Sequence, residues 1–364
     1  MIKEAIGKLV MKENLAAGEM EEAMREVVTK KASTGQIASF LTALRMKGET
    51  SEEITGGAKV IKEKSLKINL GGEAVCLDRE EITVERETIL STAKDFSGET
   101  AIFNISTATA LVVAGGGLRV AKYVKRPAPP LCGCADVIEA LGVHLDMTPS
   151  QLERCFKTLG ICFLHDHLVH NGLDHLIALR KKIGIRTLFN LLDPLINPGG
   201  ATVQVLGVYD PNLTETMAKV LMDLGIKRGL VIHGKDTLDE ISITGATKVT
   251  ELKEGKMKNY TIEPEDFGMK RRKVEEIKGG TKEENAEIIL EILKGIRGAK
   301  REVVALNAAS AFVIAGRVKG FKEGIDLAEQ TIDSGKALDS LNRLIQFTNS
   351  EPRFIRGELT AEMG

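Results

Sequence analysis

Short apolar runs alternate with segments of helical period along the chain from Ala101 onward. Runs of this kind between Gly- or Pro-rich turns are typical of buried strands. The candidate strands are residues 118–124, 201–209, 229–233 and 303–306, the last leading into a helical pattern over residues 308–315. Such alternation predicts an α/β domain, with a mostly parallel sheet flanked by helices.

The first 65 residues follow a different pattern, in which apolar side chains recur at helical spacing. One face carries Ile2, Ile6 and Leu9, and a later one carries Ile37 and Phe40. Short helices with one apolar face must pack on one another or on a second subunit. A helical stretch at residues 148–182 interrupts the strand series. Residues 71–99 are more polar and less regular, and we expect them to form a connecting segment. We therefore predict a helical domain at 1–66, joined by helices within about 148–182, and an α/β domain at 67–147 and 183–364.

Charge and composition exclude several classes of protein. The 364 residues include 50 Lys and Arg against 51 Asp and Glu, so the net charge of -1 gives no overall attraction to nucleic acid or to a membrane surface. No apolar run approaches the roughly 20 residues of a membrane span. The N-terminus resembles an amphipathic helix rather than a signal peptide, and the five cysteines are odd in number. These features predict a cytoplasmic protein with reduced thiols and no membrane partner.

Polar and charged residues follow several of the apolar runs. They are residues 104–107, residues 122–126 and the pair Asp239–Glu240. In open sheets of parallel strands, ligands bind outside the carboxyl ends of the strands. These three segments are therefore the candidate binding site.

A series of longer motifs carries a family resemblance. In order they are Phe103-Asn-Ile-Ser-Thr107, Cys132-Gly-Cys-Ala-Asp136, Gly184-Ile-Arg-Thr-Leu-Phe-Asn-Leu-Leu-Asp193-Pro-Leu-Ile-Asn-Pro198, Leu238-Asp-Glu-Ile-Ser242, Pro264-Glu-Asp-Phe-Gly268, Leu306-Asn-Ala-Ala309 and Ile332-Asp-Ser-Gly-Lys-Ala337. Their order and spacing resemble the anthranilate phosphoribosyltransferase family, of glycosyltransferase family 3 with its nucleoside phosphorylase-like fold. The resemblance implies a small helical domain, an α/β domain and a homodimer formed through the N-terminal helices. The family's pattern has Gly where Asp193 stands.

The resemblance also implies an activity, the transfer of a phosphoribosyl group from phosphoribosyl diphosphate to the amine of anthranilate with Mg²⁺. A leaving diphosphate needs hydrogen-bond donors, a cation and a metal held by carboxylates. The residues implied at phosphoribosyl diphosphate are Asn104, Ser106, Thr107, Lys122 and Arg126. Those implied at the acceptor are Arg180, Lys125 and His170, and those implied at Mg²⁺ are Ser106, Asp239 and Glu240.

Both substrate loops depart from the family's pattern. The family's Gly-Thr-Gly-Gly-Asp loop is replaced around residues 94–99, which keep one glycine, and Lys-His-Gly-Asn-Arg is replaced by Lys122-Tyr-Val-Lys-Arg126. Pro127–Pro130 follow, and proline lacks the N–H that a phosphate would use. We therefore expect a phosphoribosyltransferase-like protein, a diverged member with an altered amine acceptor or reduced activity. The alternatives are a non-catalytic protein that binds nucleic acid or another polyanion, and an ordinary family enzyme with divergent loops.

Two local patterns leave further alternatives open. His165-Asp166-His167 with Cys132 and Cys134 is compatible with a transition-metal site, but polar residues lining a wet cleft and buried thiols are the favoured interpretation. The basic run 270–273 is compatible with phosphate contacts, whereas a solvated loop balanced by Glu275 and Glu276 is favoured.

Overall fold

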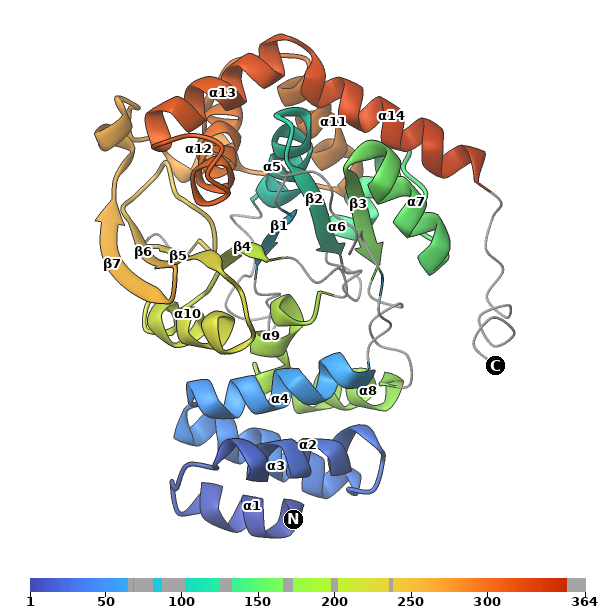
Figure 1. Cartoon of the computed structure of the whole chain (residues 1–364), viewed down its shortest axis with the longest axis vertical. Coiled ribbons are helices and arrows are strands. Elements are labelled where there is room, and N and C mark those ends of the chain that lie inside the picture. The colour runs from blue at the N-terminus through green and yellow to red at the C-terminus, as the bar shows by residue number, and fades with distance from the viewer. Residues whose placement is uncertain are drawn as a thin grey trace.

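The computed structural model describes residues 1–64, 68, 81–86, 102–124, 133–165, 173–197, 202–235 and 238–351, with 81–86 described by their backbone. A stack of helices at the N-terminus lies below a larger part that is built around a sheet (Figure 1). This arrangement confirms the predicted fold class, a small helical domain with a larger α/β domain.

Four helices form the N-terminal part, as the apolar spacing predicts. They are α1 (Ile2–Val10), α2 (Ala17–Val28), α3 (Thr34–Lys47) and α4 (Ser51–Lys64). The apolar faces meet in a dry core, where Met20, Met24, Phe40 and Leu41 are fully buried. Burial of these faces stabilises helices that would be too short to persist alone in water.

A buried carboxylate links three segments of the helical part. Glu53 accepts hydrogen bonds from the backbone N–H of Leu15 at 2.9 Å and of Thr50 at 2.8 Å. Its other partner is the ammonium of Lys47, at 2.9 Å, and both side chains are buried. A buried charge requires such partners, so Glu53 fixes the end of α3 and the start of α2 against α4.

One sheet of seven strands runs through the described part of the larger region, in the order β3-β2-β1-β4-β5-β6-β7. The strands are β1 (Glu81–Arg86), β2 (Arg119–Val124), β3 (Ile161–His165), β4 (Val203–Gly207), β5 (Arg228–Gly234), β6 (Thr247–Lys253) and β7 (Lys256–Ile262). The first five pair in parallel, and β6 and β7 are antiparallel. The mostly parallel sheet is thus confirmed, and three of the predicted strands correspond to β2, β4 and β5.

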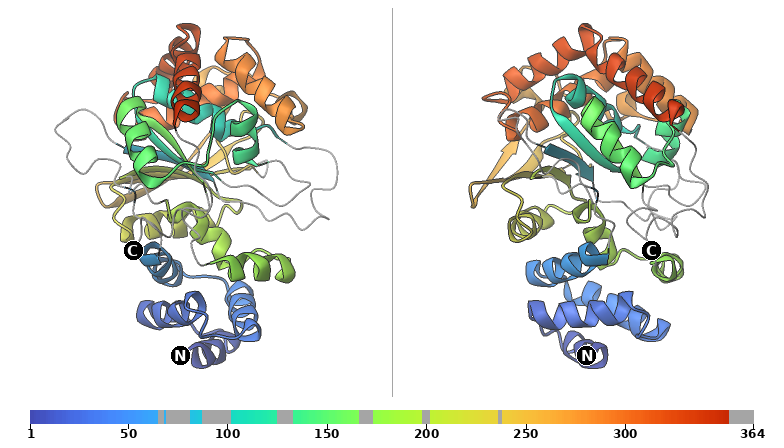
Figure 2. Two further views of the ribbon diagram at one scale, coloured as in Figure 1. Left: turned by 90° about the vertical axis from the view of Figure 1, so that its right-hand side faces the viewer. Right: turned by 45° about the vertical axis from the view of Figure 1, so that its right-hand side comes forward.

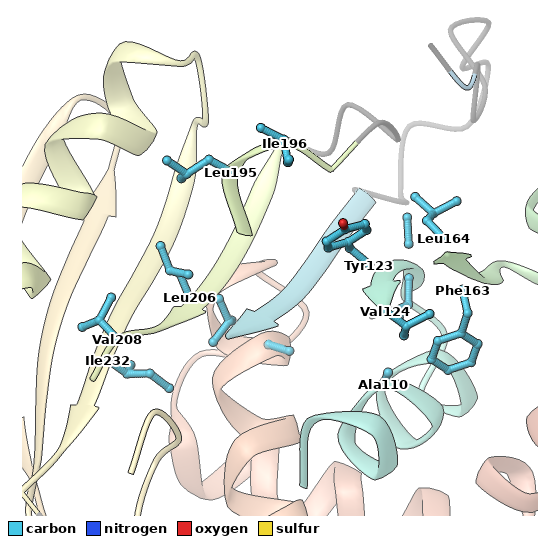
Figure 3. Packing of buried hydrophobic residues seen from close by; sticks show 14 of the residues in the cluster. Ala110, Tyr123, Val124, Phe163, Leu164, Leu195, Ile196, Leu206, Val208 and Ile232 are labelled. Carbon is cyan, nitrogen blue, oxygen red and sulfur yellow. The ribbon is translucent and has the colours of Figure 1, made fainter. Parts of the chain in front are cut away.

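Helices cover the sheet on two sides (Figures 1 and 2). They include α5 (Ile105–Gly115), α6 (Cys134–Ala140), α10 (Leu213–Asp223), α11 (Lys282–Leu293), α12 (Ala299–Ile314), α13 (Phe321–Asp333) and α14 (Lys336–Ser350). Helix α12 packs on α5, α13, β4 and β5, whereas α10 packs on β5, β6 and α4. Figure 3 shows part of the core, with Val124 of β2, Phe163 of β3 and Ala110 of α5 among its buried side chains.

The fourth predicted strand, 303–306, is wrong, because these residues lie inside helix α12. Almost every side chain of this helix is buried, including those of Val303, Val304 and Leu306. A helix buried on all sides has an unbroken apolar sequence, and over four residues such a run cannot be distinguished from a buried strand.

The predicted helical stretch 148–182 is also corrected, because it contains strand β3. Helix α7 (Pro149–Leu159) ends at Gly160, whose φ of +74° is the left-handed conformation that glycine adopts readily. After β3, helix α8 (Asp174–Ile183) follows. Helix α8 packs on the N-terminal helix α3, whereas α7 packs on β3 and α14.

The predicted connecting segment 71–99 contains a central strand, β1, which pairs with both β2 and β4. The hairpin of β6 and β7 likewise had no counterpart among the predicted strands. These segments carry many charged residues, and polar strands give a weak apolar signal.

The helical part and the sheet are joined by short helices and by aromatic contacts. Helix α9 (Leu188–Leu192) packs on α3 and α4. The guanidinium of Arg186 lies 3.8 Å from the ring centroid of Tyr209, and that of Arg45 lies at 5.7 Å. Tyr209 follows β4, so these cation–π contacts connect the end of α3 to the carboxyl end of a sheet strand. Within the described ranges, none of the helices is both long and apolar enough to span a bilayer.

Candidate active site

The start of α5 presents buried hydroxyl groups. Asn104 is the N-cap residue, and Ser106 and Thr107 lie in the first turn, all three buried. The Oγ of Ser106 and the Oγ1 of Thr107 have no hydrogen-bond partner among the described residues. Buried hydroxyls are nearly always hydrogen-bonded, and a helix N-terminus favours anions. This turn is therefore suited to an anionic ligand.

Consecutive hydrogen bonds orient the side chain of Asn104. Its Oδ1 accepts a hydrogen bond from the Nδ2 of Asn285 on α11 at 3.2 Å, and its Nδ2 lies 3.7 Å from the Sγ of Cys134. Asn285 Oδ1 in turn accepts from the backbone N–H of Gly280 at 2.9 Å. Asn285 was not among the predicted site residues, because nothing in the local sequence shows that α11 reaches Asn104 from 181 positions away.

Lys122 lies within the sheet. It is a β2 residue paired in register with Phe163 of β3, and only 1% of it is exposed. The carbonyl of its neighbour Ala121 accepts a hydrogen bond from Asn197 at 2.9 Å. A buried ammonium is costly unless polar groups or an anion face it, so the position of Lys122 suits an anionic ligand.

The pair Asp239–Glu240 lies buried in the loop after β5. Asn307 of α12 holds this loop by two hydrogen bonds to the backbone of Ile241. Its Oδ1 accepts from the N–H of Ile241, and its Nδ2 donates to the carbonyl of Ile241, each at 2.9 Å. The N–H of Gly234 also donates to the carbonyl of Leu238 at 2.8 Å. The loop is thus tied down on either side of the two carboxylates.

Gly207, the last residue of β4, permits this loop to approach. A Cβ at Gly207 would lie 1.7 Å from the carbonyl oxygen of Asp239, which is far inside a van der Waals contact. Neither Gly207 nor Asn307 was predicted as a site residue. Asn307 stands in one of the family-like motifs, and this was the only sequence signal that could have indicated it.

Carboxylates are ligand types that Mg²⁺ uses. No cluster of three or more His, Cys, Asp or Glu side chains suited to a metal ion occurs among the residues with described side chains. Mg²⁺ commonly uses one or two protein carboxylates and completes its shell with water and substrate phosphates. Asp239 and Glu240, together with the hydroxyl of Ser106, supply ligand types of this kind.

Arg180 of α8 forms a buried ion pair. Its Nη2 donates to the Oδ2 of Asp193 at 3.0 Å, and its guanidinium lies 5.6 Å from the ring centroid of Phe189. Asp193 begins a short 3₁₀ turn, η2 (Asp193–Leu195). The carbonyl of Pro194 in this turn accepts a hydrogen bond from Gln204 of β4 at 2.8 Å, so the turn is anchored on the sheet.

Several predicted residues lie outside the described residues. They are Arg126, Lys125 and His170 of the predicted site, the replaced loops 94–99 and 127–130, and Cys132, Asp166 and His167 of the alternative metal site.

His165 ends β3, where its Nδ1 lies 3.7 Å from the Oδ1 of Asp146. Burial raises the pKa of the Cys155 thiol to about 12, which keeps that thiol protonated and unreactive at neutral pH.

The basic run 270–273 is compensated by glutamates. Arg271 pairs with Glu263 at 2.9 Å and with Glu265 at 3.1 Å. Arg272 pairs with Glu302 at 2.6 Å. Two of its four cations are therefore already neutralised by the chain, which weakens this run as a phosphate-binding surface.

The chain resembles known proteins over nearly its whole length. The glycosyl transferase family matches twice, by its helical bundle domain at residues 3–65 and by its a/b domain at residues 97–338. An anthranilate phosphoribosyltransferase of Citrifermentans bemidjiense is 47% identical over 349 residues, covering 96% of this chain and 99% of the relative. One of Geobacter sulfurreducens is 45% identical over 349 residues, covering 96% of this chain and 100% of the relative. The chain belongs to the anthranilate phosphoribosyltransferase family.

Solved structures agree with that assignment. Anthranilate phosphoribosyltransferase of Thermus thermophilus has a TM-score of 0.83 at 36% identity, covering 95% of this chain and 99% of that one. The enzyme of Saccharomyces cerevisiae, in complex with phosphoribosyl diphosphate (PRPP) and Mg, has a TM-score of 0.82 at 25% identity, covering 96% and 98%. The resemblance first drawn from the motifs is thereby confirmed.

Proposed function

We propose that this chain transfers the phosphoribosyl group of PRPP to an amine acceptor, with Mg²⁺. The observation that carries the proposal is the pair of buried carboxylates at Asp239 and Glu240, next to Ile241, whose backbone Asn307 holds by two hydrogen bonds. Mg²⁺ is commonly held by one or two protein carboxylates together with substrate phosphates, so this pair fits Mg²⁺ bound with a diphosphate. The PRPP and Mg complex of the yeast relative supports this choice of ligand.

Each remaining group has a role in that reaction. Asn104, Ser106 and Thr107 would hold the diphosphate at the N-terminus of α5, with Lys122 and Arg126 as its cations. Arg180, Lys125 and His170 would line the acceptor side. When bound through Asp239, Glu240 and Ser106, Mg²⁺ would neutralise charge on the leaving diphosphate.

The bonds balance without a further reactant. The acceptor nitrogen donates its lone pair to the anomeric carbon and forms a C–N bond. The C–O bond to the diphosphate breaks, its electron pair leaves with the diphosphate, and the proton lost by the amine passes to water. The role of the protein is to orient the two reactants and to stabilise charge on the leaving group.

Titration calorimetry with PRPP tests the proposal. We expect binding in the presence of Mg²⁺ and an affinity at least about tenfold lower after chelation with EDTA, because the buried carboxylates would then repel the diphosphate. Release of diphosphate with an added amine would follow as the turnover assay. A well-folded sample that gives no heat at millimolar PRPP and Mg²⁺ would remove the transferase from consideration.

We also propose that the chain acts in the cytoplasm as a homodimer formed through its N-terminal helices. Three large apolar side chains, Val10, Met11 and Met46, are 67%, 73% and 82% exposed in this part of the single chain. Contact with a second chain through these helices would cover such exposed apolar side chains. Light scattering that gives the 39.5 kDa mass of one chain would contradict the dimer.

A further inference from the structure

Helix α11 reaches the first turn of α5 through one buried side chain, that of Asn285. This residue is 4% exposed and contacts Asn104 from 181 positions away. The chain before it packs closely on the residue before Asn104. A Cβ at Gly279 would lie 2.5 Å from the Oδ1 of Asn285 and 2.7 Å from the backbone nitrogen of Phe103. The absence of a side chain at Gly279 therefore allows the start of α11 to fit against the start of α5.

Main-chain groups fix the direction in which the carboxamide of Asn285 points. Its Oδ1 accepts a hydrogen bond from the N–H of Gly280 at 2.9 Å, and its Nδ2 donates to the carbonyl of Gly280 at 3.3 Å. A backbone N–H can only donate and a backbone carbonyl can only accept, so the oxygen and the nitrogen of this carboxamide cannot exchange places. The Nδ2 of Asn285 is therefore the atom that faces Asn104, 3.2 Å from its Oδ1.

The orientation of Asn285 determines that of Asn104. Because a donor faces it, Asn104 presents its Oδ1 to Asn285 and turns its Nδ2 to the other side, where the Sγ of Cys134 lies 3.7 Å away. Asn104 is the N-cap residue of α5, yet its side chain makes no capping hydrogen bond to that helix. An asparagine at this position ordinarily accepts from an N–H of the first turn. Here its oxygen is held by Asn285, so the side chain leaves the start of α5 to another acceptor.

The same turn of α5 indicates that this acceptor is a ligand. The hydroxyls of Ser106 and Thr107 are buried and have no hydrogen-bond partner among the described residues. An ionised phosphate oxygen accepts hydrogen bonds and donates none, so it requires donors on every side. The Nδ2 of Asn104 meets this requirement, whereas its Oδ1 in the same position would repel the diphosphate.

We propose that Asn285 is a positioning residue, which fixes Asn104 so that its amide nitrogen, and not its oxygen, is available to the diphosphate. The proposal rests on the proposed function, because it concerns the diphosphate end of the same site. Asn285 would contact neither reactant and would act through Asn104 alone. Its effect on diphosphate binding should therefore disappear when the carboxamide of Asn104 is removed.

The first test is Asn285→Asp, which keeps the shape of the side chain and exchanges its donor for an acceptor. At pH 8.5, about four units above the usual pKa of an aspartic acid side chain, a carboxylate would face the Oδ1 of Asn104. Rotation of the Asn104 amide relieves that repulsion and points its oxygen at the diphosphate. We expect calorimetry with Mg²⁺ to give an affinity for PRPP at least about tenfold lower than that of the wild type, the size of a lost hydrogen bond to a charged group. An affinity within about twofold of the wild type would overturn the proposal.

The second test repeats this change in the variant Asn104→Ala. Without the carboxamide of Asn104 there is no group for the new carboxylate to rotate, so Asn285→Asp should change the affinity for PRPP by less than about twofold in this background. A loss as large as in the wild-type background would overturn the proposal, because it would show that Asn285 acts by another route. If Asn285→Asp does not fold, Asn285→Ala is taken through the same cycle. Its expected loss of at least about threefold should likewise vanish in Asn104→Ala.

Asn349→Asp is the matched control. The Nδ2 of Asn349 on α14 donates to the carbonyls of Gly142 and Ile345, each at 2.8 Å, so this substitution makes the same exchange of donor for acceptor on another element. Its affinity for PRPP should remain within about twofold of the wild type. Equal losses in Asn285→Asp and in the control would overturn the proposal, because they would show a general effect of the added charge.

Inorganic diphosphate, titrated into the same chains with Mg²⁺, distinguishes failure of the two proposals. If the wild type binds diphosphate and not PRPP, the proposed transfer fails, and the cycle measured with diphosphate decides the role of Asn285. If PRPP binds and Asn285→Asp binds it as tightly as the wild type does, the role of Asn285 alone fails. If the folded wild type binds neither ligand, both proposals fail.

Discussion

The variant Asp239→Asn/Glu240→Gln is expected to keep its fold, and its turnover rate is expected to be at least about 1,000-fold lower than that of the wild type. Both substitutions preserve side-chain shape, and the loop remains held by the two hydrogen bonds between Asn307 and Ile241. The loss of charge removes the proposed ligands of Mg²⁺. A thousandfold loss corresponds to roughly 4 kcal/mol in the activation free energy, the range expected for metal stabilisation of a leaving group.

Diphosphate release, measured with saturating PRPP and Mg²⁺, checks this expectation. Glu21→Gln/Glu22→Gln is the matched control, because it removes the same two charges from neighbouring positions on α2, where Glu22 is exposed. The control should keep its turnover within about twofold, as expected for surface changes. A double variant in the loop that turned over as fast as the control would show that Asp239 and Glu240 do not hold the metal.

Gly207→Ala is expected to lower turnover about 100-fold, although it adds only one methyl group. The new Cβ would lie 1.7 Å from the carbonyl oxygen of Asp239 and 2.6 Å from its carbonyl carbon. Strand β4 cannot easily yield, because Gly207 is paired with Arg86 of β1 and with Ile232 of β5. The loop with the two carboxylates must therefore move by an ångström or more, and a displacement of about 1 Å can cost about 100-fold in rate.

Gly229→Ala in the neighbouring strand β5 is the control for this prediction. There the added Cβ would meet the Cδ1 of Leu221 at 3.3 Å and the carbonyl oxygen of Gln204 at 3.4 Å, contacts that a small shift of the leucine relieves. We expect its turnover to change by less than about threefold. Thermal unfolding of both variants separates a loss of fold from a displaced loop. If folded Gly207→Ala matched Gly229→Ala in turnover, the close approach of β4 would not position the carboxylates.

Much of the fold could be predicted from local patterns. The helical N-terminus follows from apolar spacing, and β2, β4 and β5 follow from apolar runs beside turns. The errors share one cause. Residues 303–306 are apolar because α12 is buried on all sides, and β1 was missed because a central strand with charged residues has no apolar run. The spacing of apolar residues reflects which side chains are buried. It therefore predicts the wrong secondary structure where burial does not follow the period of the helix or strand.

The candidate site divides in a similar way. Asp239–Glu240, Arg180 and the residues around Ser106 could be named from the family resemblance, and their burial is now described. Asn285, Asn307 and Gly207 could not be named, because each acts through a contact with a residue distant in the chain. Asn307 is 66 positions from Ile241, and Asn285 is 181 positions from Asn104.

The sequence by itself determined the residue types and their order, and with them the class of fold, the family and the residues expected to bind substrate and metal. Only the tertiary structure decided that Asp193 pairs with Arg180, that Asn307 holds the carboxylate loop, and that Gly207 leaves room for it. Local patterns arise from the periodic burial of neighbouring residues, whereas an ion pair or a close approach depends on which elements pack together. That information appears only once the chain has folded.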